Sequence, residues 1–117
     1  MTGCRERKPI NPGYHEYAYV SNGKSDSVSV IDVLSLRNIK TIAVGKNPTG
    51  VAANPKKNEI YVANTESNNI TVIDAERNQV VSTIGVYRAP YFVSVSADGK
   101  RAYVANSGSS NVSVLDL

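Results

Sequence analysis

The chain has 117 residues, of which 41% are hydrophobic and 20% charged, and its net charge is +3. This length fits one repeat-built domain, and no apolar stretch approaches the roughly 20 residues of a membrane-spanning helix. Basic residues are interleaved with acidic ones, and the one basic cluster, residues 5–8, is interrupted by Glu6. The composition therefore favours solvated turns over a nucleic-acid or membrane-binding patch.

The N-terminal segment, residues 1–16, is predicted to be irregular. Residues 8–14 lie where a first inner strand belongs, but they contain two prolines, which cannot donate to a strand ladder. No apolar segment follows Met1, so the given sequence predicts no secretory signal. The single Cys4 has no internal disulfide partner, and His15, the only histidine, is expected to be an exposed ring.

The remainder, residues 17–117, is an array of one repeated unit. The motif Tyr-Val-Ser/Ala-Asn begins at 19, 61 and 103, and both 61−19 and 103−61 equal 42. A period in the forties is typical of propeller blades or of helical pairs. Further positions repeat with the same offset, namely Ser25/Ser67/Ser109, Val30/Val72/Val114 and Asp32/Asp74/Asp116.

Residue type indicates strands rather than helices. Short stretches of Val, Ile, Thr and Tyr alternate with Asn, Ser, Gly, Asp and Lys clusters, and no run of about a dozen helix-forming residues occurs. Four strands fit the middle unit, at 49–53, 59–63, 69–74 and 79–84. Asp98-Gly99 predicts a tight hairpin turn in the next unit, since Gly accepts positive φ. The predicted fold is all-β, a β-propeller of four-stranded antiparallel blades.

The side-chain pattern predicts how the blades pack. The segments 70–73 and 80–84 are apolar on nearly every residue, so both faces of these strands are expected to be covered by neighbouring blades. The strictly repeated Tyr19, Tyr61 and Tyr103 are expected to fill volume between blades. The recurring Asn22, Asn64 and Asn106 are expected to anchor the following turn.

The chain resembles the YVTN family of β-propeller repeats. The matching features are the tetrapeptides, the Val/Ile-x-Val-Ile/Leu-Asp segments at 28–32, 70–74 and 112–116, and Gly-x-x-Pro at 45–48. The resemblance implies a commonly seven-bladed propeller of the kind found in surface-layer and secreted proteins, with lactonase-like and quinoprotein-like relatives. It therefore implies an extracellular or cell-surface location, although fold alone does not fix function.

The chain presents about two and a half to three blades. Ten strands are predicted, whereas even a four-bladed propeller needs about sixteen. Three explanations are open: a fragment of a longer propeller, an oligomer that completes the ring, or a degenerate product. Open blade edges favour self-association in any of these cases.

No catalytic, cofactor or metal site is predicted. Nucleophilic catalysis needs a base beside the nucleophile, and His15 lies in the irregular segment. One His and one Cys are too few for a nitrogen or sulfur metal site. The repeated Asp32, Asp74 and Asp116 follow apolar strands, where turn capping explains them better than calcium binding.

The clearest departure from the repeat is Tyr87-Arg88-Ala89-Pro90-Tyr91-Phe92, which replaces Gly45-Lys46-Asn47-Pro48-Thr49-Gly50. Tyr87, Arg88 and Tyr91 are therefore the candidate partner-binding residues, at the entry to an inner strand. The favoured function is a non-catalytic scaffold that binds a protein or glycan. The alternative is a fragment of a lactonase-like or quinoprotein-like enzyme whose catalytic residues lie in missing blades.

Overall fold

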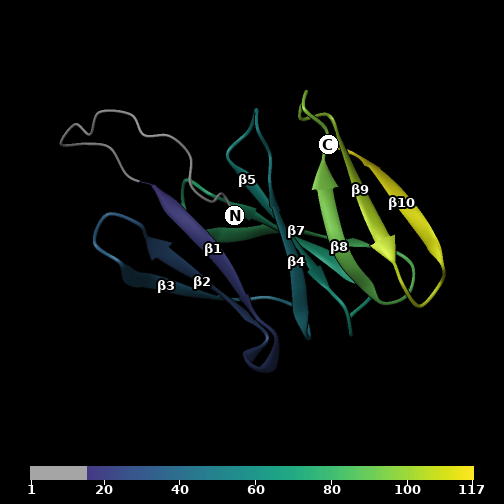
Figure 1. The fold of residues 1–117 in the computed structure, drawn as a ribbon, viewed down its shortest axis with the longest axis horizontal. Coiled ribbons are helices and arrows are strands. Elements are labelled where there is room, and N and C mark those ends of the chain that lie inside the picture. Colours follow the sequence, from purple (N-terminus) through teal and green to yellow (C-terminus); the bar gives the residue numbers. More distant parts are fainter. Residues whose placement is uncertain (1–15) are drawn as a thin grey trace.

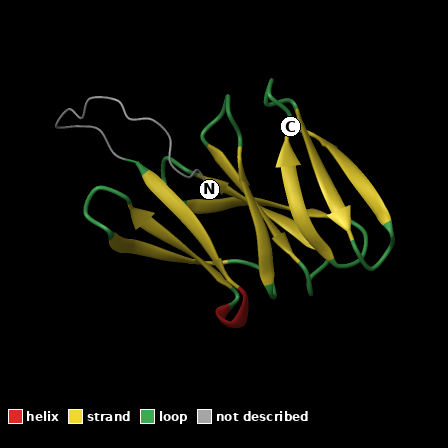
Figure 2. Ribbon diagram, in the orientation of Figure 1, coloured by secondary structure: helices red, strands yellow, loops and turns green. Residues whose placement is uncertain are grey.

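A computed structural model describes residues 16–117, which form three antiparallel sheets in chain order (Figure 1). We call these sheets blade 1 (β1–β3), blade 2 (β4–β7) and blade 3 (β8–β10). Among the described residues the only other regular element is a single 3-10 turn, η1, between β1 and β2 (Figure 2). The strand bounds are β1 Tyr17–Asn22, η1 Gly23–Ser25, β2 Ser27–Asp32, β3 Arg37–Ala43, β4 Pro48–Ala53, β5 Glu59–Asn64, β6 Asn69–Asp74, β7 Gln79–Gly85, β8 Pro90–Val95, β9 Arg101–Asn106 and β10 Asn111–Asp116.

The three blades confirm the predicted partial β-propeller. The predicted strand at 69–74 coincides with β6, and β4, β5 and β7 each extend the prediction by one residue. Blade 2 has the order β4-β5-β6-β7, in which each strand pairs only with its neighbours in sequence. In Figure 1 the three sheets lie side by side in chain order, and each packs with one face on the next.

The hairpins β1–β2, β5–β6 and β9–β10, one in each blade, have a common construction. Asp26, Asn68 and Ser110 occupy equivalent repeat positions, and each has a positive φ of 54–56°. Asn tolerates this left-handed conformation better than most residues. The preceding Asn64 clamps its hairpin, because its Nδ2 donates to Asn69 Oδ1 at 2.9 Å and to Thr71 Oγ1 at 2.8 Å. The predicted anchoring role of this asparagine is therefore confirmed.

Two of the three repeated aspartates, Asp32 and Asp74, cap turns, as the sequence predicts. The Asp74 carboxylate accepts hydrogen bonds from the Glu76 and Arg77 backbone amides at 2.8 and 3.4 Å. Asp32 accepts the equivalent bond from the Leu34 amide at 3.0 Å. The Asp98-Gly99 turn is also as predicted, with Gly99 at φ +74°.

The hydrophobic core lies between the blades. We call the face of a blade that is turned toward the preceding blade its leading face, and the opposite one its trailing face. Two clusters fill the two junctions, and each combines one trailing with one leading face. At the first junction lie Tyr19, Val28, Val30, Ile42, Ile60, Val62 and Ile73. At the second lie Tyr61, Ala63, Ile70, Val72, Val93, Ala102 and Val104.

The repeated tyrosines fill the junctions, which confirms their predicted role for two of the three. The Tyr19 hydroxyl donates to Asn78 Oδ1 in blade 2 at 2.6 Å. The Tyr61 hydroxyl donates to Glu59 Oε1 at 2.7 Å and accepts from Asn54 Nδ2 at 2.9 Å. Asn54 also donates to the Gly99 carbonyl of blade 3 at 3.0 Å. Tyr103 lies on the trailing face of blade 3 and is 39% exposed, against 1% for Tyr61.

The expectation that both faces of the third and fourth strands are covered is correct for β6 and wrong for β7. The four central residues of β6 are buried, but five consecutive residues of β7, 79–83, are exposed. Strand β3, the equivalent strand of blade 1, is exposed as well, except at Ile42. These strands form the outer edge of their blades, where the neighbouring sheet does not reach. Their apolar residues therefore reflect β-propensity more than burial.

The left-handed backbone at Ala89 supplies a prediction about stability. Ala89 has φ +53°, whereas the equivalent residue of the preceding repeat is Asn47, at φ +54°. Because Asn adopts this conformation at lower cost, Ala89→Asn is expected to raise the free energy of unfolding by about 0.5–1 kcal/mol. Urea unfolding of the two proteins measures the difference. Ala97→Asn, in an exposed turn without positive φ, is the control and should show no gain.

The buried tyrosines predict an alkaline limit of stability. Burial raises the pKa of Tyr19 and of Tyr61 from the ordinary 10.0 to about 12. A raised folded-state pKa means that stability is fully present below pH 10 and is lost as pH rises toward 12. The free energy of unfolding, measured by urea at a series of pH values, should fall across this window, and Tyr61→Phe should reduce the fall. Tyrosinate absorbance that developed fully near pH 10 in the folded protein would contradict the expectation.

Candidate functional site

The candidate partner-binding residues lie at the end of blade 3 where two loops run together. The segment 86–89 leads into β8, and the turn 107–110 joins β9 to β10; both lie at the lower end of blade 3 in Figure 1. The Ser107 and Gly108 amides donate to the Ala89 and Arg88 carbonyls at 2.9 and 3.0 Å. Ser109 Oγ accepts from the Arg88 amide at 2.9 Å. We call this pair of segments the loop rim of blade 3.

Tyr87, Arg88 and Tyr91 are all exposed. Two hydrogen bonds to the facing turn fix the backbone of Arg88. Its side chain is exposed on the surface. Tyr91 lines a shallow hollow of about 240 Å³ together with Ser107 and Ser110 of that turn. The structure therefore brings Arg88 and Tyr91 against the same turn, but of the three candidate residues Tyr91 alone lines the hollow.

The polar lining of this hollow comes from the hairpin between β9 and β10. Its walls include Asn106, Asn111 and Val112, beside Tyr91. Asn106 Nδ2 donates to Asn111 Oδ1 and to Ser113 Oγ, at 3.1 and 2.9 Å. The hollow therefore combines one aromatic ring, two aliphatic side chains, Ala105 and Val112, and several hydroxyl and amide groups, a chemistry suited to contact with a polar ligand or a peptide.

The inner strands show what the departure from the repeat changes. In blade 2, Thr49 Oγ1 donates to the Tyr91 carbonyl of blade 3 at 3.1 Å. A Cβ on Gly50 would lie 2.8 Å from that carbonyl oxygen and 2.9 Å from Phe92 Cα. These two residues therefore let β8 approach β4 closely. In blade 3 the equivalent positions are Tyr91 and Phe92, and both side chains are exposed.

The exposure of Phe92 is a feature that sequence reasoning did not include among the site residues. Its signal was available, because Phe92 is the single phenylalanine of the chain and replaces Gly50 in the repeat. Only the structure shows that this position lies on the trailing face of blade 3, as Gly50 lies on that of blade 2. The loop rim of blade 3 and the start of β8 thus present three aromatic rings and one arginine on a continuous stretch of six residues.

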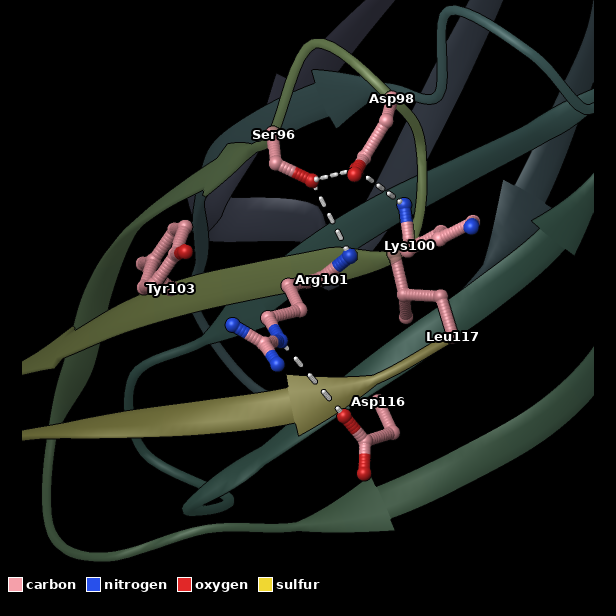
Figure 3. A pocket seen from close by; sticks show the side chains of 7 residues that line it. All are labelled: Ser96, Asp98, Lys100, Arg101, Tyr103, Asp116 and Leu117. Atoms are coloured by element: carbon pink, nitrogen blue, oxygen red, sulfur yellow. Dashed lines mark hydrogen bonds and ion pairs between the residues drawn. The ribbon is translucent and has the colours of Figure 1, made fainter.

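A second hollow, of about 530 Å³, lies on the trailing face at the opposite end of blade 3. Figure 3 shows its lining, in which Ser96 Oγ donates to Asp98 at 2.7 Å and Asp98 accepts from the Lys100 amide at 3.0 Å. These bonds, the first above all, lower the pKa of the Asp98 carboxyl. Arg101 Nε lies 4.0 Å from Asp116 Oδ1, and both side chains are well exposed.

This larger hollow corresponds to a place that is filled in blade 2. Ser96 and Asp98 are the repeat equivalents of Asn54 and Lys56. A Cβ on Gly99 of blade 3 would lie within 2.5 Å of Asn54 Oδ1 and 2.9 Å of Lys56 Cβ, so the blade 3 turn covers that part of blade 2. The hollow in Figure 3 is therefore an uncovered junction surface rather than a built ligand pocket.

Within residues 16–117 no three His, Cys, Asp or Glu side chains group to hold a metal ion. The same residues contain no helix long and apolar enough to cross a membrane. Asp32 and Asp74 cap turns, and Asp116 is exposed beside Arg101. Residues Cys4 and His15, and the predicted irregular segment except for Glu16, lie outside the described residues.

The solved structures that are similar to this chain include the following two. Hydrazine synthase from Kuenenia stuttgartiensis shares 33% identity over 86% of the chain, with a TM-score of 0.82. Dihydro-heme d1 dehydrogenase NirN in complex with DHE shares 22% identity over 98% of the chain, with a TM-score of 0.74, and supports the fold alone. The chain spans 29% and 24% of the lengths of these proteins. No curated protein matches it.

The sequence profile of YNCE-like β-propellers matches residues 14–116, nearly the whole chain. This match agrees with the three stacked blades and with the 42-residue repeat. It does not confirm the narrower resemblance to YVTN surface-layer propellers. The chain belongs to the YNCE-like β-propeller family.

Proposed function

We propose that this chain is part of a non-catalytic β-propeller scaffold that binds a protein or glycan partner through the loop rim of blade 3. Tyr87, Arg88 and Tyr91 supply the contacts. The observation that carries the proposal is the replacement of Thr49 and Gly50, which serve blade packing, by the exposed Tyr91 and Phe92. A residue that served blade packing alone would have kept the small side chains of the repeat.

The chemistry of the loop rim supports binding rather than catalysis. Tyr and Arg are enriched among the residues that dominate binding energy at interfaces. Aromatic rings beside amides and hydroxyls also suit the apolar and polar faces of a sugar. The Arg88 backbone is fixed by bonds to Ser109 and Gly108 at 2.9 and 3.0 Å, so less conformational freedom is lost on binding.

The second candidate is a piece of a propeller enzyme, which the printed name of one similar structure, hydrazine synthase, supports. Both are named as enzymes, one a hydrazine synthase and the other a dihydro-heme d1 dehydrogenase bound to DHE. On this alternative the chain supplies wall and loops to a site completed by blades outside this sequence. Binding of haem to the chain can be titrated and followed by Soret absorbance. Stoichiometric binding would favour the enzyme alternative.

A location at the cell surface or outside the cell is also proposed, and it rests on the resemblance to YVTN propellers alone. The YVTN-type tetrapeptides at 19, 61 and 103 support a surface-layer or secreted propeller, whose exposed loops meet glycans or neighbouring proteins outside the cell. Immunogold labelling of intact source cells with an antibody to this chain would test that location. Label confined to permeabilised cells would count against it.

The test of binding uses a glycan microarray and a peptide array probed with the labelled chain. Any ligand that binds is then titrated against Arg88→Ala and Tyr91→Ala. Each substitution is expected to weaken binding at least tenfold, with Tyr87→Ala acting in the same direction. Val81→Ala, an exposed change on the outer strand β7 of blade 2, is the matched control. Unchanged affinity in folded Arg88 and Tyr91 variants would remove the loop rim from the proposal.

A further inference from the structure

Two faces of the chain are uncovered although their repeat positions are made for burial. On the trailing side, Val114 is 57% exposed, whereas its equivalent Val72 is 5% exposed. On the leading side of blade 1, Val20 is 47% exposed, whereas its equivalents Val62 and Val104 are at 0%. The same side-chain types at the same register positions differ only in whether another blade packs on them.

The two uncovered faces are complementary to each other. At both internal junctions, a trailing face with a central tyrosine packs on a leading face of small and branched apolar residues. Blade 3 presents such a trailing face, with Tyr103, Val112 and Val114. Blade 1 presents such a leading face, with Ala18 and Val20. One chain therefore carries both halves of a junction.

A second observation marks the leading side of blade 1 as a contact surface. The turn between β2 and β3 is Val33-Leu34-Ser35-Leu36, where blade 2 has Ala75-Glu76-Arg77-Asn78. Leu36 is 80% exposed and has φ +58°. A leucine in this position is unfavourable in two ways, because its backbone is strained in the left-handed region and its apolar side chain is exposed to water. Asn, as at position 78, would avoid both costs, so the turn is adapted for contact rather than for stability.

We propose that copies of this chain associate head to tail, with the trailing face of blade 3 in one copy packed on the leading face of blade 1 in the next. Tyr103 then lies against the turn 33–36, as Tyr19 lies against the turn 75–78. In that internal junction the Tyr19 hydroxyl lies 3.4 Å from the Ala75 carbonyl oxygen and 2.6 Å from Asn78 Oδ1. In the new junction Leu36 supplies an apolar contact to the tyrosine ring in place of the Asn78 bond.

The inner edge of this junction differs from the internal ones. Gly50 lets β8 approach β4, with 2.8 Å between a built Cβ and the Tyr91 oxygen. Phe92 occupies the equivalent position in blade 3 and prevents so close an approach. The contact therefore falls on β9 and β10, and Tyr87 and Arg88 of the loop rim stay free, whereas Val112, which also lines the hollow beside Tyr91, becomes part of the junction. Such a heterologous contact either closes into a ring or extends into a longer assembly.

The experiment measures mass by light scattering after size exclusion, over a concentration series of the full chain. The expected result is a concentration-dependent rise from the 12.6 kDa monomer to a multiple of it. Val114→Asp blocks the trailing face and Val20→Asp the leading face. Both sites are exposed, so both variants should fold, which circular dichroism checks. Val81→Asp, on the outer strand β7 of the middle blade, is the control and should assemble like the parent chain.

Mixing the two blocked variants identifies the arrangement. Each alone should be monomeric, and together they should form a one-to-one dimer. The intact trailing face of the Val20→Asp chain accepts the intact leading face of the Val114→Asp chain. Self-association of Val20→Asp alone would mean that two trailing faces pack together and would overturn the proposal. A parent chain that stays monomeric would also overturn it and would leave both faces to further blades of a longer polypeptide.

Discussion

Tyr61→Ala is expected to lower the free energy of unfolding by about 3–5 kcal/mol, the range for removing a large buried side chain. Tyr61 is 1% exposed and fills the junction between blades 2 and 3. Its hydroxyl bonds to Glu59 and Asn54, the latter tied to blade 3 through Gly99. The loss therefore includes cavity formation and an unpaired buried amide. A change this large is a substantial fraction of the stability of a small domain.

The matched control is Tyr103→Ala, which makes the same change at the same repeat position. Tyr103 is 39% exposed because no blade within residues 16–117 covers it, and we expect a cost below about 1 kcal/mol. Urea unfolding at low protein concentration measures both variants. Equal losses would contradict the account, because they would mean that blade stacking contributes nothing to the stabilising role of this tyrosine.

Gly50→Val is the second substitution with a large expected effect. A Cβ at this position lies 2.8 Å from the Tyr91 oxygen and 2.9 Å from Phe92 Cα, both backbone atoms that cannot rotate away. The substitution must push β8 from β4, so we expect a cost of about 1–3 kcal/mol or more. Strand propensity acts in the opposite direction, since Val favours β structure. A loss therefore reports the close contact between the two inner strands.

Gly85→Val separates the packing effect from the propensity effect. Gly85 ends β7, and a Cβ there meets no atom within 4 Å. The same chemical change should be neutral or stabilise by up to about 0.5–1 kcal/mol. Both variants are compared with the parent chain by urea unfolding. A Gly50 variant as stable as the Gly85 variant would show that β4 and β8 are not in close contact in solution.

Most of the fold follows from the sequence because the unit occurs nearly three times. Tyr61, Asn64 and Asp74 keep identical equivalents at fixed offsets, so strand and turn positions could be aligned without ambiguity. Their side chains then carry out the roles that their chemistry indicates, namely filling a junction, clamping a hairpin and capping a turn. The prediction of strand bounds was accurate to one residue throughout blade 2.

Burial was harder to predict because it depends on neighbours that a single strand does not specify. Val80 and Val81 read as buried residues of a covered strand, but they lie on the outer edge of blade 2 and are exposed. The same limit applies to Tyr103 and Val114, whose equivalents are buried. The local sequence determines the β-propensity of a strand, whereas its burial depends on whether another sheet packs on it in the folded protein.

The candidate site was located from a departure in the repeat, and its details needed coordinates. The sequence identified the stretch 87–92, but not that Gly50 marks a point of close contact between strands. It also gave no indication that Arg88 is held by the turn 107–110 through its backbone. The apolar turn 33–36 departs from the repeat as clearly and was not recognised, since its exposure and left-handed Leu36 appear only in three dimensions.

Hydrogen exchange of backbone amides tests the stacked-blade architecture most directly. At low protein concentration, amides of β6 should exchange slowly, because this strand is paired on both sides and covered on both faces. Equivalent amides of β10 should exchange much faster, because that strand pairs only with β9 and its trailing face is open. Equal protection of β6 and β10 in the monomeric chain would contradict the account.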